Sequence, residues 1–216
     1  MDDEEAIFNN NRNTPVFVMP EDQVDVIDKD SQMEFIAPTP LTEDQGKILR
    51  ETWALIKNDV TEVGVETFMG LFHTHPDAID SFLAFKDKSV QDLERSAVLK
   101  AHALRVMQTV DKCITRLDRV DRMVTLLHQL GKRHVGYHAN IRLIPIIGKQ
   151  FISAIEPKIA KKWSSETQAA WECLFSIINY NIRRGLMEEK NRRIEEAKEM
   201  EMLLKRSEAR SKRDKK

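Results

Sequence analysis

The chain has 216 residues, a formal net charge of -1 and 41% hydrophobic residues, which suits one ordinary domain with extensions. The charge is unevenly distributed, because residues 1–41 carry ten acidic and two basic side chains, and residues 187–216 carry eight acidic and eleven basic. By difference, residues 42–186 carry about +4. That surplus lacks the clustered basic stripe and the aromatic series of a nucleic-acid binder, so we expect no nucleic-acid partner.

The cysteine content and the termini point to an intracellular protein, and we expect it in the cytoplasm. Cys113 and Cys173 both lie among apolar neighbours, which is typical of reduced thiols rather than of a disulfide framework. The first residues are acidic where a signal peptide is basic, and no uncharged apolar run reaches 18 residues. We therefore expect no membrane anchor.

The predicted elements are helices, and the predicted class is all-α. Residues 1–41 are acidic and rich in proline, which predicts a disordered arm. Thr42 followed by Gln45 is a capping signal that predicts a helix from Glu43. Apolar residues then recur at helical spacing, a second helical segment follows, and Thr74 to Pro76 interrupts the pattern. After a loop at 86–91, we expect helices at 92–114, 118–134, 141–160 and 165–187, with Asn140 capping the third of these and Pro145 bending it.

Three regions result: an arm at 1–41, a domain at 42–187 and a charged tail at 188–216. In the tail, acidic and basic side chains are paired at i,i+4, as in Glu189 with Arg193 and Glu201 with Lys205, which favours a helix. Lys190 and Glu201 occupy the seam that a coiled coil would need. A solvated helix is therefore favoured over a coiled coil.

Two histidines stand in apolar helical patterns. His102 follows Val98 and precedes Val106, Thr109 and Cys113 at steps of three or four, and Met123, Leu127 and Leu130 precede His134 in the same way. A buried imidazole needs hydrogen-bond partners or a metal, since an unsatisfied one costs roughly 1 to 3 kcal/mol. A single histidine of this kind is usually a satisfied core residue, so a ligand role depends on the surrounding pattern.

Several kinds of chemistry have no motif in this chain. It contains no phosphate-binding loop, dinucleotide fingerprint, HExxH or CxxC sequence, and neither cysteine has the polar neighbours of a nucleophile. His73, His75 and Asp77 are close in sequence, but surface scatter is favoured over weak metal binding. We expect a protein that is not an enzyme.

The ordered set of helices and aromatic residues resembles the globin family over residues 42–186. The residues that carry the resemblance are Trp53, Phe68, the sequence HPDAIDSF before and at Phe82, HALRVM at 102–107 and LGKRH at 130–134. The pattern is nearer to neuroglobin and globin X than to myoglobin, and the tails are similar to those of invertebrate, notably nematode, globins. The resemblance implies a globin fold around a haem b.

The resemblance also implies roles for individual residues. His134 is implied as the proximal iron ligand, with Leu130 one turn earlier, and His102 as the distal histidine. The other implied residues are Phe82 stacked on the porphyrin, Phe68 in the distal pocket, Val106 against the ring face, and Arg105 and His138 near the propionates.

Two states of His102 stay open. It either donates a hydrogen bond to bound dioxygen or another diatomic gas, or it binds the iron itself in a hexacoordinate, bis-histidine state, which we favour and which suits a redox or oxygen-sensing role. The tails are expected to contact a protein partner or electron donor. The alternatives are oxygen storage or transport at an open iron, and haem chemistry such as nitrite reduction or nitric oxide dioxygenation.

Overall fold

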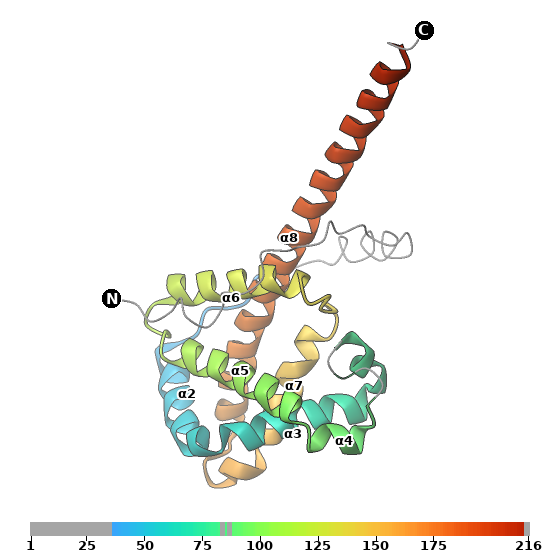
Figure 1. The fold of residues 1–216 in the computed structure, drawn as a ribbon. Helices are drawn as coiled ribbons and strands as arrows, with labels where there is room; N and C mark the ends of the chain where they lie inside the picture. The colour runs from blue at the N-terminus through green and yellow to red at the C-terminus, as the bar shows by residue number, and fades with distance from the viewer. Residues whose placement is uncertain (1–35, 83–84, 86–87, 214–216) are drawn as a thin grey trace, which may run out of the picture. The chain divides into compact units, whose positions relative to one another are not determined.

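The computed structural model describes residues 36–82, 85 and 88–213, and every regular element among them is a helix (Figure 1). The expectation of an all-α chain is confirmed. The elements in chain order are α2 Glu43–Ile56, η1 Lys57–Asp59, α3 Val60–Thr74, η2 Pro76–Ser81, α4 Val90–Glu94, α5 Ala97–Ile114, α6 Val120–Val135, α7 Ile144–Ile155, η3 Pro157–Lys162 and α8 Ser165–Arg213. Of these, η1, η2 and η3 are short 3-10 helices. The expected disordered arm lies almost entirely outside the described residues.

The described residues divide into two compact units: residues up to 194 belong to one, and residues 195–213 belong to the other. Helix α8 contributes its first part to the larger unit and its remainder to the smaller one. The boundaries expected from the sequence remain predictions. None of the described helices is long and apolar enough to cross a membrane.

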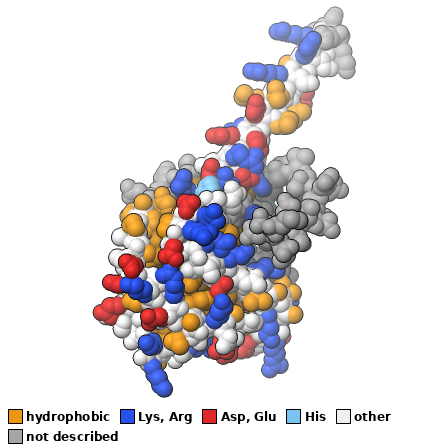
Figure 2. Space-filling view, turned by 90° about the vertical axis from the view of Figure 1, so that its left-hand side faces the viewer, with side chains coloured by type: hydrophobic (Ala, Val, Ile, Leu, Met, Phe, Trp, Pro, Cys, Tyr) orange, Lys and Arg blue, Asp and Glu red, His pale blue; other side chains and the backbone are white. Residues whose placement is uncertain are grey.

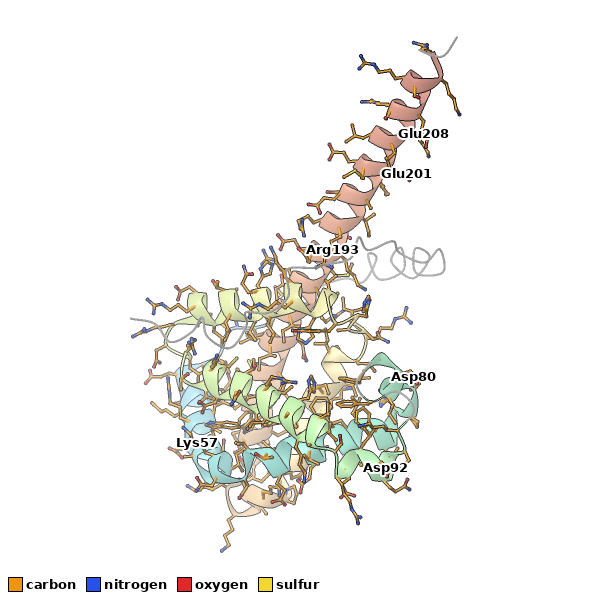
Figure 3. All side chains as sticks on the ribbon, viewed as in Figure 1. Lys57, Asp80, Asp92, Arg193, Glu201 and Glu208 are labelled. Atoms are coloured by element: carbon orange, nitrogen blue, oxygen red, sulfur yellow. The ribbon has the colours of Figure 1, made fainter. Side chains whose placement is uncertain are left out.

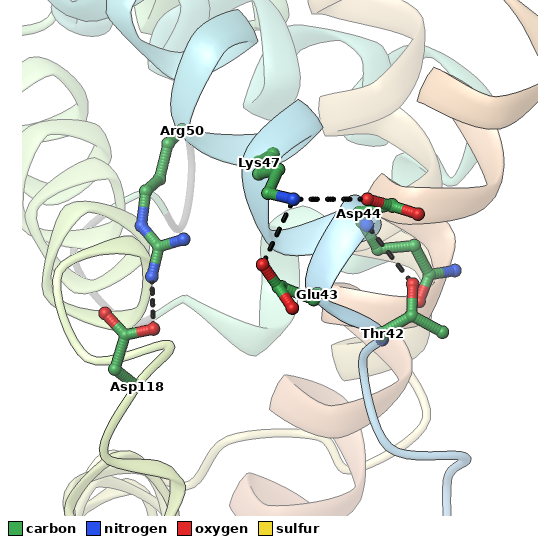
Figure 4. Close-up of polar contacts among 7 residues, drawn as sticks. Thr42, Glu43, Asp44, Lys47, Arg50 and Asp118 are labelled. Atoms are coloured by element: carbon green, nitrogen blue, oxygen red, sulfur yellow. Dashed lines mark hydrogen bonds and ion pairs between the residues drawn. The ribbon is translucent and has the colours of Figure 1, made fainter.

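The first helix begins where the sequence predicts it. Thr42 Oγ1 accepts a hydrogen bond from the Gln45 amide at 3.2 Å, and Gln45 Oε1 accepts one from the Thr42 amide at 3.0 Å. This reciprocal pair satisfies two amides that have no partner inside the helix. In the next turn Lys47 pairs with Glu43, and Arg50 reaches Asp118 at 2.7 Å (Figure 4).

Two later expectations are wrong. Asn140 does not cap a helix at 141, because α7 begins at Ile144, and Asn140 Oδ1 instead accepts a hydrogen bond from the Arg142 amide in the preceding turn. Pro145 lies in the first turn of α7 and does not bend it. A proline there removes an amide that has no helical partner in any case, so it starts the helix at little cost.

The single helices expected at 92–114 and 141–160 are each divided. Ser96 caps α5 through the Leu99 amide, which separates α5 from the short α4. Pro157 begins η3 directly after α7.

The core has two connected parts. One surrounds Trp53, Phe151, Trp171 and Phe175, and the other surrounds Phe68 and its aromatic neighbours between α3 and α5. Helix α3 packs against both α5 and α7. The Trp171 indole donates to Thr52 Oγ1 at 3.2 Å in this interior, so its polar atom is satisfied. The face drawn in Figure 2 mixes acidic, basic and hydrophobic side chains.

Candidate functional site

The candidate site lies between α5, which carries His102, and α6, which carries His134. The two histidines are half-buried, and their imidazoles interact electrostatically with each other. The side chains between the helices are drawn in Figure 3. The two histidines that the sequence singled out are thus brought to one place.

His134 is held in one orientation by its own helix. Its Nδ1 lies 2.7 Å from the carbonyl oxygen of Leu130, one turn earlier on α6. A carbonyl can only accept, so Nδ1 carries the proton and donates it, which leaves the lone pair on Nε2. Metal-binding histidines are usually fixed in this way, with one nitrogen donating to a carbonyl and the other free to coordinate.

Both imidazoles are held in the neutral form. Burial lowers the pKa of His102 to about 4, with smaller contributions from the positive charge of Arg105 and from His134. Burial also lowers the pKa of His134, against an opposing effect of its hydrogen bond to Leu130. Only a neutral imidazole has a lone pair for a metal, so burial prepares both side chains for coordination.

His102 lies within a group of aromatic rings. Its ring centroid is 5.0 Å from that of Phe68 and 5.6 Å from that of Phe82, in edge-on arrangements. Within the described part of the chain, no hydrogen bond holds the His102 ring, so apolar contacts position it. The structure therefore brings Phe68, Phe82 and His102 together, as the resemblance implied.

A fourth ring belongs to this group and was not assigned to the site from the sequence. Phe85 stacks on Phe82 with centroids 5.3 Å apart and an angle of 27° between the rings, and its centroid lies 6.3 Å from that of His102. Its spacing of three residues from Phe82 was the available signal. The sequence pattern places Phe85 in the aromatic context of the histidines, but the resemblance implies a role for Phe82 only.

The remaining implied residues differ in how well the structure places them. Val106 is half-buried and contacts both parts of the core, and Leu130 packs on the part around Trp171. Arg105 is exposed on α5, close enough for its charge to act on His102. His138 is exposed in the turn after α6, with a φ of 54°.

The buried stripe expected on α5 is shifted by one residue. Leu99, Ala103, Met107 and Val110 are the buried positions, whereas Val98 is 45% exposed. His102 therefore lies at the edge of the buried face, beside the core rather than in its middle.

The residues present fit a haem. His134 and His102, both neutral, are the residues that would hold the iron, and the haem would supply a metal able to bind a diatomic gas. Phe82 and Val106 offer the apolar surface that a flat macrocycle requires. No group of three or more metal-binding side chains occurs among the described residues, and His75 Nδ1 instead contacts Thr74 Oγ1 at 2.9 Å.

The comparisons with known proteins agree with this geometry. The family model described as Globin matches residues 65–182. Cytoglobin-1 of Oryzias latipes is 26% identical over 149 residues, covering 67% of this chain and 82% of that protein. Neuroglobin-1 of Oncorhynchus mykiss is 23% identical over 146 residues, covering 67% and 92%.

Solved structures show the same fold. A hexacoordinated haem protein from an anhydrobiotic tardigrade matches with a TM-score of 0.64 at 24% identity, over 68% of this chain and 96% of that one. Ferric azide-bound myoglobin of Aplysia limacina matches with a TM-score of 0.59 at 23% identity, over 66% and 96%.

Proposed function

The chain belongs to the globin family, and from that premise we propose that it binds a haem b through His134 and reversibly binds dioxygen or another diatomic gas. The observation that carries the proposal is the hydrogen bond from His134 Nδ1 to Leu130, which directs the Nε2 lone pair away from α6. Haem, when bound, supplies an iron that takes a sixth ligand and changes its charge by one electron.

We further propose that His102 occupies the sixth position when no gas is bound. Its neutral imidazole is confined by Phe68, Phe82 and Phe85, and no hydrogen bond within the described residues competes for its lone pair. The tardigrade protein with this fold, which is hexacoordinated, supports the assignment. His102 must then move aside before a gas can bind.

This arrangement sets the apparent affinity for gas. If the internal bond from His102 is favoured by about 1.4 kcal/mol, roughly one molecule in ten is open, and the apparent affinity falls tenfold. An iron held by two imidazoles would need little rearrangement on changing oxidation state, which favours redox or oxygen sensing over bulk storage. We also propose that the protein binds its ligand reversibly rather than turning it over, and that it works in the cytoplasm.

Arg105 and the tails complete the proposal. The exposed guanidinium of Arg105, on the same helix as His102, suits pairing with a haem propionate at the mouth of the site. The charged helix at residues 195–213 suits contact with a protein partner or electron donor, and the side chains of Glu201 and Glu208 project from it in Figure 3.

The test is a haem titration of the haem-free protein, followed by its visible spectrum. Wild type and a control, His73→Ala on the exposed end of α3, are expected to bind one equivalent with the same spectrum. His134→Ala is expected to bind haem weakly and with a changed spectrum. A His134→Ala protein that matches wild type in both respects would refute the ligand assignment.

A further inference from the structure

Helices α6 and α8 cross with their backbones in direct contact. A Cβ atom added to Gly131 of α6 would lie 2.1 Å from the Ile182 carbonyl oxygen, and one added to Gly185 of α8 would lie 2.1 Å from the His128 carbonyl oxygen. No side chain other than hydrogen fits at either position. The crossing therefore fixes the distance between the helix that carries His134 and the last helix of the domain.

One carboxylate bridges the same two helices beside this crossing. Glu188, three residues after Gly185, places Oε1 3.4 Å from Lys132 Nζ, and its Oε2 lies 2.5 Å from His128 Nε2 without the geometry of a hydrogen bond. His128 and Lys132 are one turn apart, on the side of α6 that faces α8. Although burial acts to raise the pKa of Glu188, Lys132 and His128 together lower it.

The neighbouring residue pairs with basic side chains of its own helix. Glu189 is buried, and its Oε1 accepts hydrogen bonds from Arg192 at 2.7 Å and Arg193 at 2.8 Å. The hydrogen bond from Arg192 is the main reason that the pKa of Glu189 is about 2. Glu189 is consequently ionised, and its pairs stabilise the helical turn that follows Glu188.

Rotation of α6 about its own axis is the motion that this bridge opposes. Two glycines in contact fix a distance and add no side chain that resists rolling, so resistance to rotation comes from the buried side chains of Met123 and Leu127 and, outside the core, from Glu188. An imidazole Nε2 lies roughly 7 Å from its helix axis, so a rotation of about 10° displaces it by roughly 1 Å. Displacements of that size matter at a metal ligand.

We propose that Glu188 is a positioning residue that fixes the rotation of α6 through His128 and Lys132, and thereby the direction in which His134 Nε2 meets the iron. The effect of Glu188 on haem coordination rests on the proposed function. Its effect on the position of α6 does not, because the contacts of Glu188 are present in the protein without haem. The two effects are therefore measured separately.

The first measurement is amide hydrogen exchange along α6 in the haem-free protein. Glu188→Gln keeps the size of the side chain and removes its charge, and Glu188→Asp keeps the charge on a shorter arm. Glu172→Gln is the matched control, since Glu172 is exposed on α8 and bonds to Gln168 of the same helix. We expect exchange in α6 to accelerate roughly two- to fivefold in Glu188→Gln, less in Glu188→Asp and not in the control.

The second measurement is the iron–imidazole vibration in the ferrous protein, read by resonance Raman in a His102→Leu background that leaves His134 as the protein's axial ligand. Glu188→Gln is expected to shift and broaden this band, with partial recovery in Glu188→Asp. Faster exchange with an unchanged band would overturn the proposal, because Glu188 would then be merely structural. Unchanged amide exchange in Glu188→Gln would also overturn the proposal. If the protein binds no haem, the proposed function is wrong, but the exchange measurement still shows whether Glu188 restrains α6.

Discussion

Acidification of the haem-free protein should destabilise it through His102 in particular. The pKa of this imidazole is 6.5 in an ordinary environment and about 4 in the folded chain, where burial opposes its charge. Between pH 6.5 and pH 4 the imidazole is protonated in the unfolded chain but neutral in the folded chain. The contribution of His102 to the free energy of unfolding is therefore fully present above pH 6.5 and falls as the pH is lowered towards 4. Linkage with these two values gives a loss of about 2 kcal/mol between pH 8 and pH 5, and about 3 kcal/mol below pH 4.

Urea unfolding of the haem-free wild type and of His102→Leu, each at pH 8 and pH 5, isolates this contribution. His134 contributes in the same direction in both proteins, since its pKa is also lowered, so it cancels in the comparison. The free energy of unfolding should fall by about 2 kcal/mol more in wild type than in the variant. Equal losses in the two proteins would show that His102 is not held neutral by burial, and the account of its environment would be wrong.

Three further outcomes follow from the packing. Thr52→Val should lower the free energy of unfolding by about 1 to 3 kcal/mol in urea titration, because the buried indole of Trp171 loses its hydrogen-bond acceptor. An unchanged free energy of unfolding would show that this hydrogen bond does not stabilise the protein. A chain ending at residue 194 should be more stable than one ending at 189 by roughly 1 to 3 kcal/mol, because the shorter one removes both arginines from the buried carboxylate of Glu189; equal melting curves would contradict this. Cys113 is buried, and burial raises its pKa to about 12, so a thiol reagent should modify Cys113 only after unfolding. Modification mapped to Cys113 in the native protein, as distinct from the half-buried Cys173, would contradict its placement.

Local signals in the sequence were sufficient where one short-range interaction decides the structure. The capping pair of Thr42 and Gln45 depends on residues three apart, and it forms as predicted. The same kind of reasoning failed at Asn140, because an asparagine can satisfy a turn as readily as a helix, and the choice depends on where Pro145 allows the helix to begin. Asn140 and Pro145 both occur in turns and at helix starts, and only the packed structure determines which of them begins the helix.

The two histidines of the site can be predicted from the sequence, but the residues that surround and position them cannot. Helical spacing indicates which residues share a face of α5, but it does not say which face is buried. The predicted stripe runs through Val98 and His102, whereas the buried stripe runs through Leu99 and Ala103, one residue further along. The bridge from Glu188 to His128 joins residues 60 positions apart in sequence, on helices whose crossing depends on two glycines. No local pattern encodes such a contact.

The visible absorption spectrum of the deoxygenated ferrous protein tests the central claim most directly. With His134 on one side of the iron and His102 on the other, the spectrum should show sharp, resolved bands in wild type, one broad band in His102→Leu, and neither spectrum in His134→Ala. Resolved bands that persist in His134→Ala would contradict the account, because some other residue would then hold the iron.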